Sequence, residues 1–507
     1  MDRSCLKIMV VVFLFSAWNS DALGSYAKAQ RSFKGRDYVS AAPEFFNVMV
    51  FAKNQSQRRK TEWGLAQSLH KLGLFYSASK YYTIIVRRGR KSSNPFFRKA
   101  LEALGKIDRQ VSLGQSHVEK VFKAKVRTAD VPGAARGFYF YYKGVAAFSR
   151  NELENAGRFF SKVPGGSPYN LPAIFHQGVV ANLSGRSSRS ISKFQKVLRA
   201  TSGDRNAELY ESALINIARV HYEQKRYTQA ITFYGRIPRD SGYWLDAIWE
   251  TAWAFFFLQK FNNTLGQIHT IHSPFFSSRF YPESYILQAI TFMRLCRFPQ
   301  VKKSMKQFKV RYKPMFKSVN AMLNRFKRNP RGFFKFVNRY NNSGRMRRFD
   351  KSEEVIKKLT KVDAYKEARD IIRFSQREIE ALGRFKGRWS SGGLQDDLKT
   401  FLRKKKGTAV SGAGRNMYKL AREYYALLLD LSNQTKLIVA EMQLGRLATL
   451  RERISAFKQK TKVNFIGGMQ QLNIGQSLEY WPFEKEYWED ELGFYVYNLG
   501  SRCKKEN

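Results

Sequence analysis

The sequence predicts an all-α protein: a superhelical solenoid of paired helices, followed by a long helical hairpin or coiled-coil region. Two observations support this fold class. Short amphipathic helices recur with constant offsets between small and large residues, and two longer stretches beyond residue 350 carry apolar residues at helical spacing. With 43% hydrophobic and 15% aromatic residues in 507 positions, the chain can bury a large core and is not disordered.

The repeating unit is clearest in residues 211–238, ESALINIARVHYEQKRYTQAITFYGRIP. A small anchor residue in the first helix is followed by a second slot twelve residues later and by a large apolar residue four residues after that. Seven copies keep this phase: Ala29, Ala41, Phe45; Ala66, Ala78, Tyr82; Gly144, Ala156, Phe160; Gly178, Ser190, Phe194; Ala218, Ala230, Tyr234; Ala252, Thr264, Ile268; and Ala289, Val301, Met305. The pattern resembles the tetratricopeptide repeat, in which helix pairs of about 34 residues stack into a solenoid.

The anchors Ala66 and Gly144 are separated by about two units, so we expect a degenerate eighth copy near residues 96–122. Residues 25–130 are therefore interpreted as amino-terminal repeats that include the degenerate one, and 131–310 as the main repeat array. A basic aromatic segment (311–350), a long-helix region (351–477) and an acidic aromatic tail (478–507) follow.

Residues 1–24 predict a secretory signal peptide. Arg3 and Lys7 precede an apolar run over 8–18, and small residues follow at 20, 22 and 24. An uncleaved anchor or a buried first helix is the alternative. The expected location is the periplasm, and without a second long apolar run the mature protein is expected to be soluble or peripheral. In that oxidising compartment Cys296 and Cys503 could pair, or Cys296 could simply be packed in a repeat turn.

The formal net charge of +50 indicates polyanionic or acidic partners. For a cytoplasmic protein nucleic acid would come first. For an exported protein the candidates are lipopolysaccharide phosphates, anionic lipids, the cell-wall polymer or acidic proteins.

The segment 284–349 contains no Asp or Glu, and aromatic residues alternate with its cations. It predicts a surface that binds a polyanion or a partner, although its aromatic residues could instead be core. The cations nearest to Pro330 and Gly344 are the candidate binding residues: Lys327, Arg328, Arg331, Arg345, Arg347 and Arg348.

Two long helices are expected after this segment, over 351–388 and 417–459. Ser390 to Gly393 should break the first. The basic run 403–406 and the glycines at 407, 412 and 414 should form a flexible turn before the second.

The tail, LEYWPFEKEYWEDELGFYVY over 478–497, is acidic and aromatic. In so basic a chain it is expected to clasp the protein's own positive surface or to meet a partner. Its candidate interaction residues are Trp481, Phe483, Trp488, Asp490 and Glu491.

The strings IPRDSGYWLDAIWETAWAFF, SPFFSSRFYPES and LCRF, within residues 207–314, resemble the tetratricopeptide proteins of the adventurous gliding motility envelope machinery in gliding and predatory bacteria. The tail also resembles that family's closing motif. The resemblance implies a non-catalytic envelope scaffold whose partners are other proteins of the motility complex.

No catalytic motif, phosphate-binding loop or zinc-spaced cysteine pair is present, and no cofactor or metal is expected. His269 and His272 are interpreted as packing or loop residues. The sequence thus predicts a periplasmic scaffold that binds a partner helix or peptide in its solenoid groove. A wall- or lipopolysaccharide-binding adaptor and, less favoured, an intracellular nucleic-acid binder remain as alternatives.

Overall fold

The computed structural model describes residues 26–52, 54–91, 94–122, 126–202, 207–343, 349–459 and 486–503. They form helices, and no strand occurs among them. The chain divides into two compact units: Met1–Lys193, Arg328–Arg339 and Thr360–Tyr418 form unit 1, and Phe194–Lys327, Tyr340–Leu359 and Lys419–Asn507 form unit 2. Within the described ranges, no helix combines the length and apolar character needed to cross a membrane.

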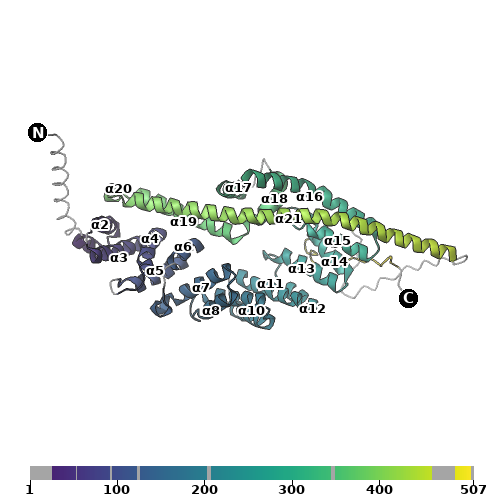
Figure 1. Cartoon of the computed structure of the whole chain (residues 1–507), viewed down its shortest axis with the longest axis horizontal. Coiled ribbons are helices and arrows are strands. Elements are labelled where there is room, and N and C mark those ends of the chain that lie inside the picture. The colour runs from purple at the N-terminus through teal and green to yellow at the C-terminus, as the bar shows by residue number, and fades with distance from the viewer. Residues whose placement is uncertain are drawn as a thin grey trace. The chain divides into compact units, whose positions relative to one another are not determined.

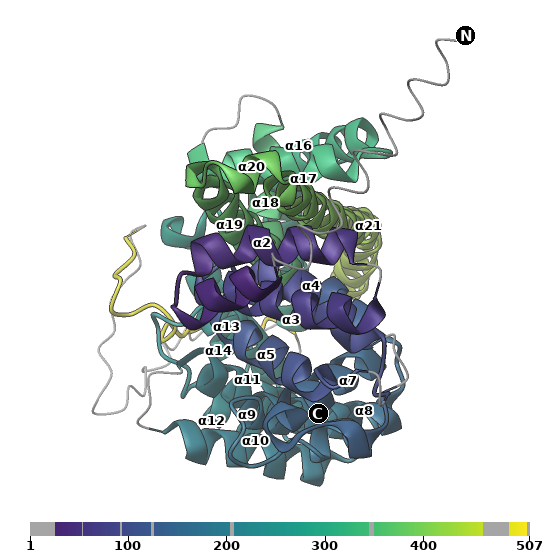
Figure 2. The same ribbon diagram turned by 90° about the vertical axis from the view of Figure 1, so that its left-hand side faces the viewer.

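Successive helices, taken two at a time along the chain, occupy the described residues up to 326 (Figures 1 and 2). In order they are residues 26–34 with α2 (Tyr38–Phe51), α3 (Gln55–Lys71) with α4 (Phe75–Arg87), α5 (Phe97–Gln110) with α6 (Gln115–Phe122), α7 (Gly133–Ser149) with α8 (Leu153–Ser161), α9 (Asn170–Leu183) with α10 (Ser187–Thr201), α11 (Ala207–Glu223) with α12 (Tyr227–Tyr234), α13 (Trp244–Phe257) with α14 (Phe261–Ile271), and α15 (Glu283–Arg294) with α16 (Phe298–Phe326). The helices α5 and α6 occupy the residues for which a degenerate eighth copy is predicted, and α6 packs against α4 and α7. The predicted helical solenoid is therefore confirmed.

The repeated small residues allow the two helices of a pair to approach closely. All seven anchors, their partners twelve residues later and the large residues after sixteen are buried. A Cβ atom on Gly144 would lie 2.5 Å from a ring carbon of Phe160, the large residue of the same copy. The large side chain thus fills the space that the small anchor leaves open, which is the contact that the sequence pattern predicts.

Each of these seven pairs also turns in the same way. The residue seven positions after the anchor has positive φ in every copy, and the next amide closes a bond back to the first helix, as in Arg226 N to His221 O at 2.9 Å. Glycine supplies this left-handed conformation at 73 and 185. The other five residues are Arg36, Asn151, Lys225, Gln259 and Cys296.

In unit 1, α19 (Asp363–Arg384), α20 (Arg388–Ser391) and the first part of α21 (Leu394–Gln459) form an antiparallel hairpin that packs on the early repeats. Lys406 Nζ donates to Gln376 Oε1 at 2.7 Å across the hairpin. Trp389 is buried and its indole N–H donates to the carbonyl of Val39 at 2.8 Å. The expected break near residues 390–393 is present.

Glu378 of α19 caps the amino terminus of α4. Its buried carboxylate accepts the backbone N–H of Tyr76 at 2.6 Å, the backbone N–H of Ser77 at 3.0 Å and the Ser77 hydroxyl at 2.7 Å. The residue before α4, Leu74, offers no side-chain cap, so the donors of the first turn depend on a carboxylate from a distant helix.

In unit 2, the second part of α21 pairs with α16. Phe316 stacks on Tyr425 with ring centroids 4.6 Å apart, and a Cβ on Gly445 would lie 3.3 Å from the Phe298 ring. In these contacts the residue numbers of α21 decrease as those of α16 increase, so the two helices are antiparallel. Buried residues recur every three or four positions on both helices, which is the pattern of a coiled-coil seam.

Two expected boundaries in the long-helix region are wrong. The predicted flexible turn over 403–414 does not exist, because α21 continues through it (Figure 1). A Cβ on Gly414 would lie 2.0 Å from the carbonyl oxygen of Pro330, at the start of α17 (Pro330–Ser343), so this glycine serves helix packing and not a turn.

The single helix expected over 351–388 is also interrupted. It comprises η3 (Asp350–Ser352), α18 (Glu353–Thr360) and α19, with extended backbone at Val362. The buried residues of α18 belong to unit 2 and those of α19 to unit 1, so the two helices serve different cores. The remaining short helices are η1 (Thr128–Asp130) and η2 (Pro274–Phe276).

Replacing the capping carboxylate should destabilise unit 1. We expect Glu378→Ala to lower the free energy of unfolding by about 2–4 kcal/mol, because buried donors of α4 lose a charged acceptor. Denaturant unfolding measures the change. Glu380→Ala, on the exposed side of the same helix, is the control and should change stability little; equal losses in both variants would contradict the capping role.

Candidate partner-binding surface

A surface of aromatic side chains lies on the repeats of unit 2. It consists of residues from α11, α12 and α13, which we call the aromatic surface: Tyr222, Tyr227, Trp249, Trp253, Phe256 and Phe257. The four residues of α13 follow at spacings of four, three and one, so they share one side of the helix. Ala252, the small anchor between them, faces the core.

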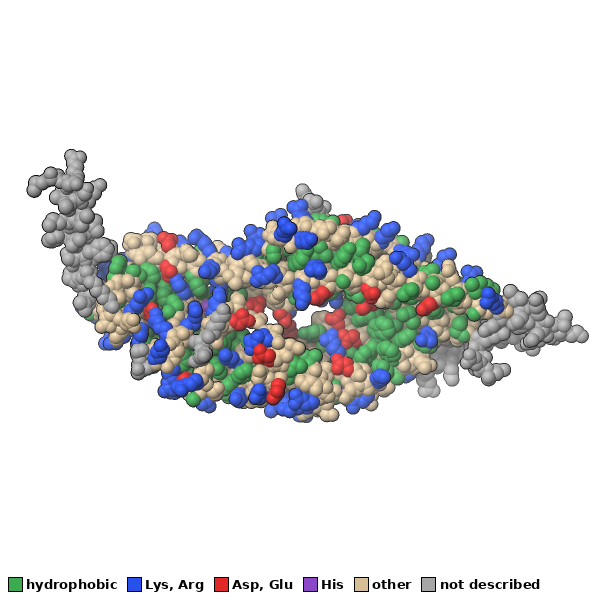
Figure 3. Space-filling view, in the orientation of Figure 1, with side chains coloured by type: hydrophobic (Ala, Val, Ile, Leu, Met, Phe, Trp, Pro, Cys, Tyr) green, Lys and Arg blue, Asp and Glu red, His purple; other side chains and the backbone are tan. Residues whose placement is uncertain are grey.

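The rings support one another and keep area in contact with solvent. Phe257 stacks on Tyr227 at 5.2 Å and on Trp253 at 5.9 Å between ring centroids, and Trp249 meets Trp253 edge to face at 5.9 Å. Phe257 is 48% exposed, and the other five are partly buried. Hydrophobic side chains gather over α13 in Figure 3.

Paired charges flank the aromatic surface. Arg219 of α11 binds Glu250 with an Nη2 to Oε1 distance of 2.6 Å, and the Tyr234 hydroxyl donates to the same carboxylate at 2.7 Å. Burial, reinforced by Glu250, raises the pKa of Tyr234, so this hydroxyl stays protonated as a donor. The charges beside the rings are thus held in fixed positions.

A second ionic contact involves α18. Asp246 accepts from the Tyr281 hydroxyl and lies 3.4 Å from Lys358 Nζ, and the same ammonium is 4.5 Å from the centre of the Tyr281 ring. The Lys358 ammonium therefore interacts with both the Asp246 carboxylate and the Tyr281 ring.

The aromatic surface can bind apolar side chains of another protein. Trp and Tyr are enriched among residues that dominate binding energy, and rings already ordered by their neighbours lose little entropy on binding. Its flanking polar groups are paired with one another.

The structure places three of the six predicted basic residues. Lys327, Arg328 and Arg331 are exposed, and Arg331 Nε donates to Ser411 Oγ at 2.6 Å. Arg345, Arg347 and Arg348 lie outside the described residues. A polyanion-binding role for this set stays a prediction.

Most aromatic residues of the basic segment are core. Between residues 308 and 340, six rings are buried and contribute to helix packing: Phe308, Tyr312, Phe326, Phe333, Phe334 and Tyr340. The interpretation in which these six stack on a ligand is therefore wrong. Their helical spacing was compatible with both interpretations.

The carboxyl-terminal tail is described from residue 486, so Trp481 and Phe483 lie outside the described residues. The described part of the tail packs on α13 and α14 of its own chain. The sequence predicted contact through the acidic side chains, whereas Arg239 donates to the backbone carbonyls of Glu489, at 3.1 Å, and of Asp490.

The acidic side chains of the clasp face outward. Asp490 and Glu491 are exposed, and Trp488 is 50% exposed. Among the ion pairs formed between described residues, none uses Asp490 or Glu491. Backbone bonds and rings, rather than charge pairing, hold the described part of the tail.

The tail surrounds His269 of α14. The imidazole stacks on Tyr487 at 4.7 Å and meets Tyr495 at 4.8 Å and Tyr497 at 5.8 Å between ring centroids. Desolvation lowers the pKa of His269 to about 4. His272 stacks on Tyr285, and among the described residues no group of three metal-ligating side chains occurs. Both histidines are packing residues, as expected from the sequence.

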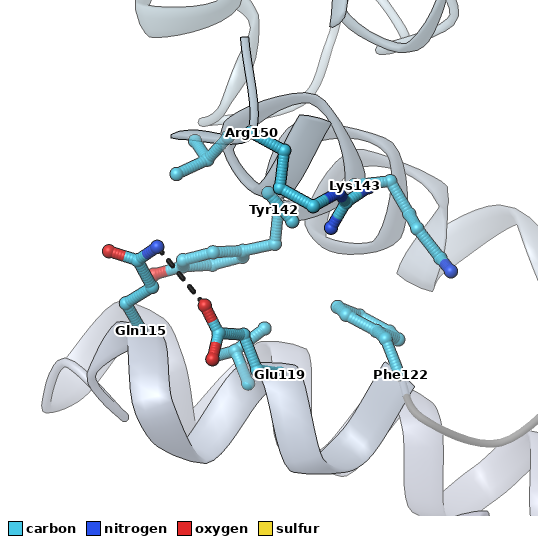
Figure 4. A pocket seen from close by; sticks show the side chains of 9 residues that line it. Gln115, Glu119, Phe122, Tyr142, Lys143 and Arg150 are labelled. Carbon is cyan, nitrogen blue, oxygen red and sulfur yellow. Dashed lines mark hydrogen bonds between the residues drawn. The ribbon is translucent and has the colours of Figure 1, made fainter. Parts of the chain in front are cut away.

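A hollow of about 250 Å³ lies between α6 and α7 in unit 1 (Figure 4). Gln115 Nε2 donates to Glu119 Oε1 at 3.2 Å in its wall, and Arg150 is paired with Glu152. Desolvation, reinforced by Arg150, lowers the pKa of Lys143 beside the Phe122 ring. These groups are largely satisfied within the chain, and we assign no ligand to the hollow.

No protein-family model matches this chain, and no curated protein matches its sequence. Among solved structures, the chain is similar to a tetratricopeptide repeat protein from Parabacteroides merdae ATCC 43184. The identity is 15%, the match covers 51% of this chain and 93% of that chain, and the TM-score is 0.30. The helix pairs of this chain, with their small-residue contacts and common turn, make its fold a tetratricopeptide-like helical solenoid.

Sequence reasoning singled out the basic segment and missed the aromatic surface as a site. The available signal was four large rings, Trp249, Trp253, Phe256 and Phe257, around one small anchor. A repeat helix needs one buried face, so this excess of rings predicts that some remain accessible.

The docking of the tail should depend on pH. His269 binds a proton more weakly when covered by the tail, with a pKa of about 4 against 6.5 for a free imidazole, so docking should be strongest above pH 6.5 and weaken as pH falls toward 4. The groups facing it are Tyr487, Tyr495 and Tyr497. At His272, which follows α14 directly, burial and then Arg311 lower the pKa to about 3.

Hydrogen exchange at the Gly493 amide, corrected for intrinsic rates, measures this effect in a Cys503→Ser background. We expect protection to fall roughly tenfold or more between pH 7 and pH 5. His269→Phe should flatten the profile, whereas His221→Phe, on a ring that stacks with Phe233 elsewhere, should not. An unchanged profile in His269→Phe would refute the assignment.

Proposed function

We propose that this protein is a non-catalytic helical-repeat scaffold that binds a partner protein at the aromatic surface. The supporting observation is the set of mutually packed, partly exposed rings centred on Trp253 and Phe257. The partner segment is an amphipathic helix or extended peptide that inserts apolar side chains between these rings. Acidic residues flanking those apolar anchors would suit the chain's net charge of +50.

We further propose that the protein is exported to the periplasm and acts in an envelope assembly such as a gliding motility complex. The charged start and apolar run of residues 1–24 support export, and the disulfide between Cys296 and Cys503 suits an oxidising compartment. The resemblance of residues 207–314 to gliding motility proteins supports the assembly. Cell fractionation with amino-terminal sequencing of the mature protein tests this; a cytoplasmic protein that retains Met1 would exclude it.

Truncating the central ring should weaken partner binding. A photo-crosslinking residue at Phe257, used in the native cell, identifies the bound protein. We then expect Trp253→Ala to lower the measured affinity for that purified partner by about 30-fold, the effect of losing one dominant contact of about 2 kcal/mol.

Val310→Ala is the matched control, since Val310 is 69% exposed on α16, away from the aromatic surface. Circular dichroism shows whether each variant is folded. Equal affinities of the Trp253 and Val310 variants would exclude the aromatic surface as the binding site.

A second candidate function is binding of an anionic envelope polymer. It is favoured by the exposed cations Lys327, Arg328 and Arg331. Sedimentation with purified cell wall or lipopolysaccharide should then weaken steeply as salt rises, because ions screen exposed charges. We expect the Lys327→Glu, Arg328→Glu double variant to bind less at low salt. Sedimentation that is insensitive to salt would remove this candidate.

A further inference from the structure

The tail lies on unit 2 as an extended peptide ligand would. From Gly493 to Gly500 its residues alternate between partly buried and exposed positions. Tyr495 and Tyr497 are on the partly buried set and reach the His269 imidazole, whereas Phe494 and Val496 are 71% and 55% exposed. Every second residue of the segment therefore faces the covered side of α14.

Backbone bonds fix the register of this segment. Asn262 accepts the Tyr497 amide at its carbonyl, at 3.2 Å, and the Leu499 amide at its Oδ1, at 3.1 Å. At the other end, the Gly493 amide donates to Thr270 Oγ1 at 2.8 Å, and Gln267 Nε2 donates to the Gly493 carbonyl at 2.9 Å.

Two glycines allow the close approach. A Cβ on Gly266 of α14 would lie 1.6 Å from the carbonyl oxygen of Tyr495, so only glycine fits there. Gly493 has φ of +93, and a Cβ there would lie 3.2 Å from both Ile248 and Trp244. The face of α14 and the segment thus fit each other so closely that an added methyl group at Gly266 would overlap the segment's backbone.

A disulfide joins the end of the segment to the last repeat. Cys503 is bonded to Cys296, and next to it the Arg502 amide donates to the Leu295 carbonyl at 3.0 Å. Arg297 also donates to the carbonyl of Gly500 at 2.9 Å. The sequence left open whether Cys296 and Cys503 pair, and in the structure they do.

We propose that the face of α14 is a peptide-binding site that also accepts the same segment from a second copy of this chain, which produces disulfide-linked assemblies of the scaffold. Every copy of the chain carries both the face of α14 and the tail segment that binds to it. A segment from a second copy makes the same contacts with α14 as the chain's own segment. The two states therefore differ mainly in the effective concentration of the segment at the face of α14.

The covalent step requires no net oxidation. The thiolate of a small thiol attacks Cys503 Sγ, which breaks the bond to Cys296 and releases that sulfur as a thiolate. Cys296 of the second copy, as thiolate, then attacks Cys503 Sγ in the mixed disulfide and releases the small thiol. Each step breaks one S–S bond and forms one, and the thiol is regenerated.

Two complementary full-length variants, both in a Cys5→Ser background, test the proposal. The donor, Cys296→Ser, keeps Cys503, and the acceptor, Cys503→Ser, keeps Cys296. When they are mixed in a glutathione buffer that maintains the wild-type disulfide, we expect a disulfide-linked heterodimer whose amount rises with protein concentration. Non-reducing electrophoresis and peptide mass spectrometry identify the bond between Cys503 and Cys296.

Gly266→Ala in the acceptor leaves the cysteine intact and blocks the site. We expect the heterodimer to fall by more than about tenfold, since the added methyl group overlaps the backbone of the segment. The control is Gly383→Ala in the acceptor, at a helical position with no atom within 4 Å, and it should leave the yield unchanged. Circular dichroism verifies folding of both.

Two outcomes would overturn the proposal. If no heterodimer forms while the wild-type protein retains its internal bond in the same buffer, the segment docks only within its own chain. If the heterodimer forms equally well with Gly266→Ala, the cysteines meet by random collision and α14 is not the docking site.

Discussion

The structure depends on one contact, repeated along the chain: a small residue in the first helix of a pair against a large one in the second. Gly144 facing Phe160 shows it most clearly, because the space for a methyl group on Gly144 is already filled by the ring. The contact sets the distance between paired helices, and the left-handed turn seven residues after the anchor reverses the chain. On α13, Trp249, Trp253 and Phe256 pack against the cluster of Ala252 and Ile268 and keep part of their area in contact with solvent.

Features encoded by neighbouring residues could be predicted from the sequence. The helix pairs, the helices α5 and α6, and the break before Leu394 all depend on spacings within a few turns. Features that depend on distant partners could not. The role of Gly414 is decided by the carbonyl of Pro330, and the cap of α4 comes from Glu378. Glycine near a basic run is a turn signal unless such a partner is known.

The candidate sites show the same division. The composition of the tail suggested that it binds its own chain, but it did not show which groups make the contacts. The described contacts involve backbone carbonyls and the rings around His269, whereas Asp490 and Glu491 are exposed to solvent. Helical periodicity also does not distinguish a buried ring from an accessible one. For that reason the sequence left open whether the rings between residues 284 and 349 are core or binding residues, and Trp253 was not singled out; Phe333 and Phe334 are buried.

The disulfide between Cys296 and Cys503 has a mechanical consequence. It encloses α16 to α21 in a covalent loop, because all of these helices lie between the two cysteines in the chain. A pulling force applied at Cys503 passes directly into the turn between α15 and α16 and then through the repeats toward the amino terminus. The shortest covalent path for that load therefore bypasses the long helices and runs through the repeats.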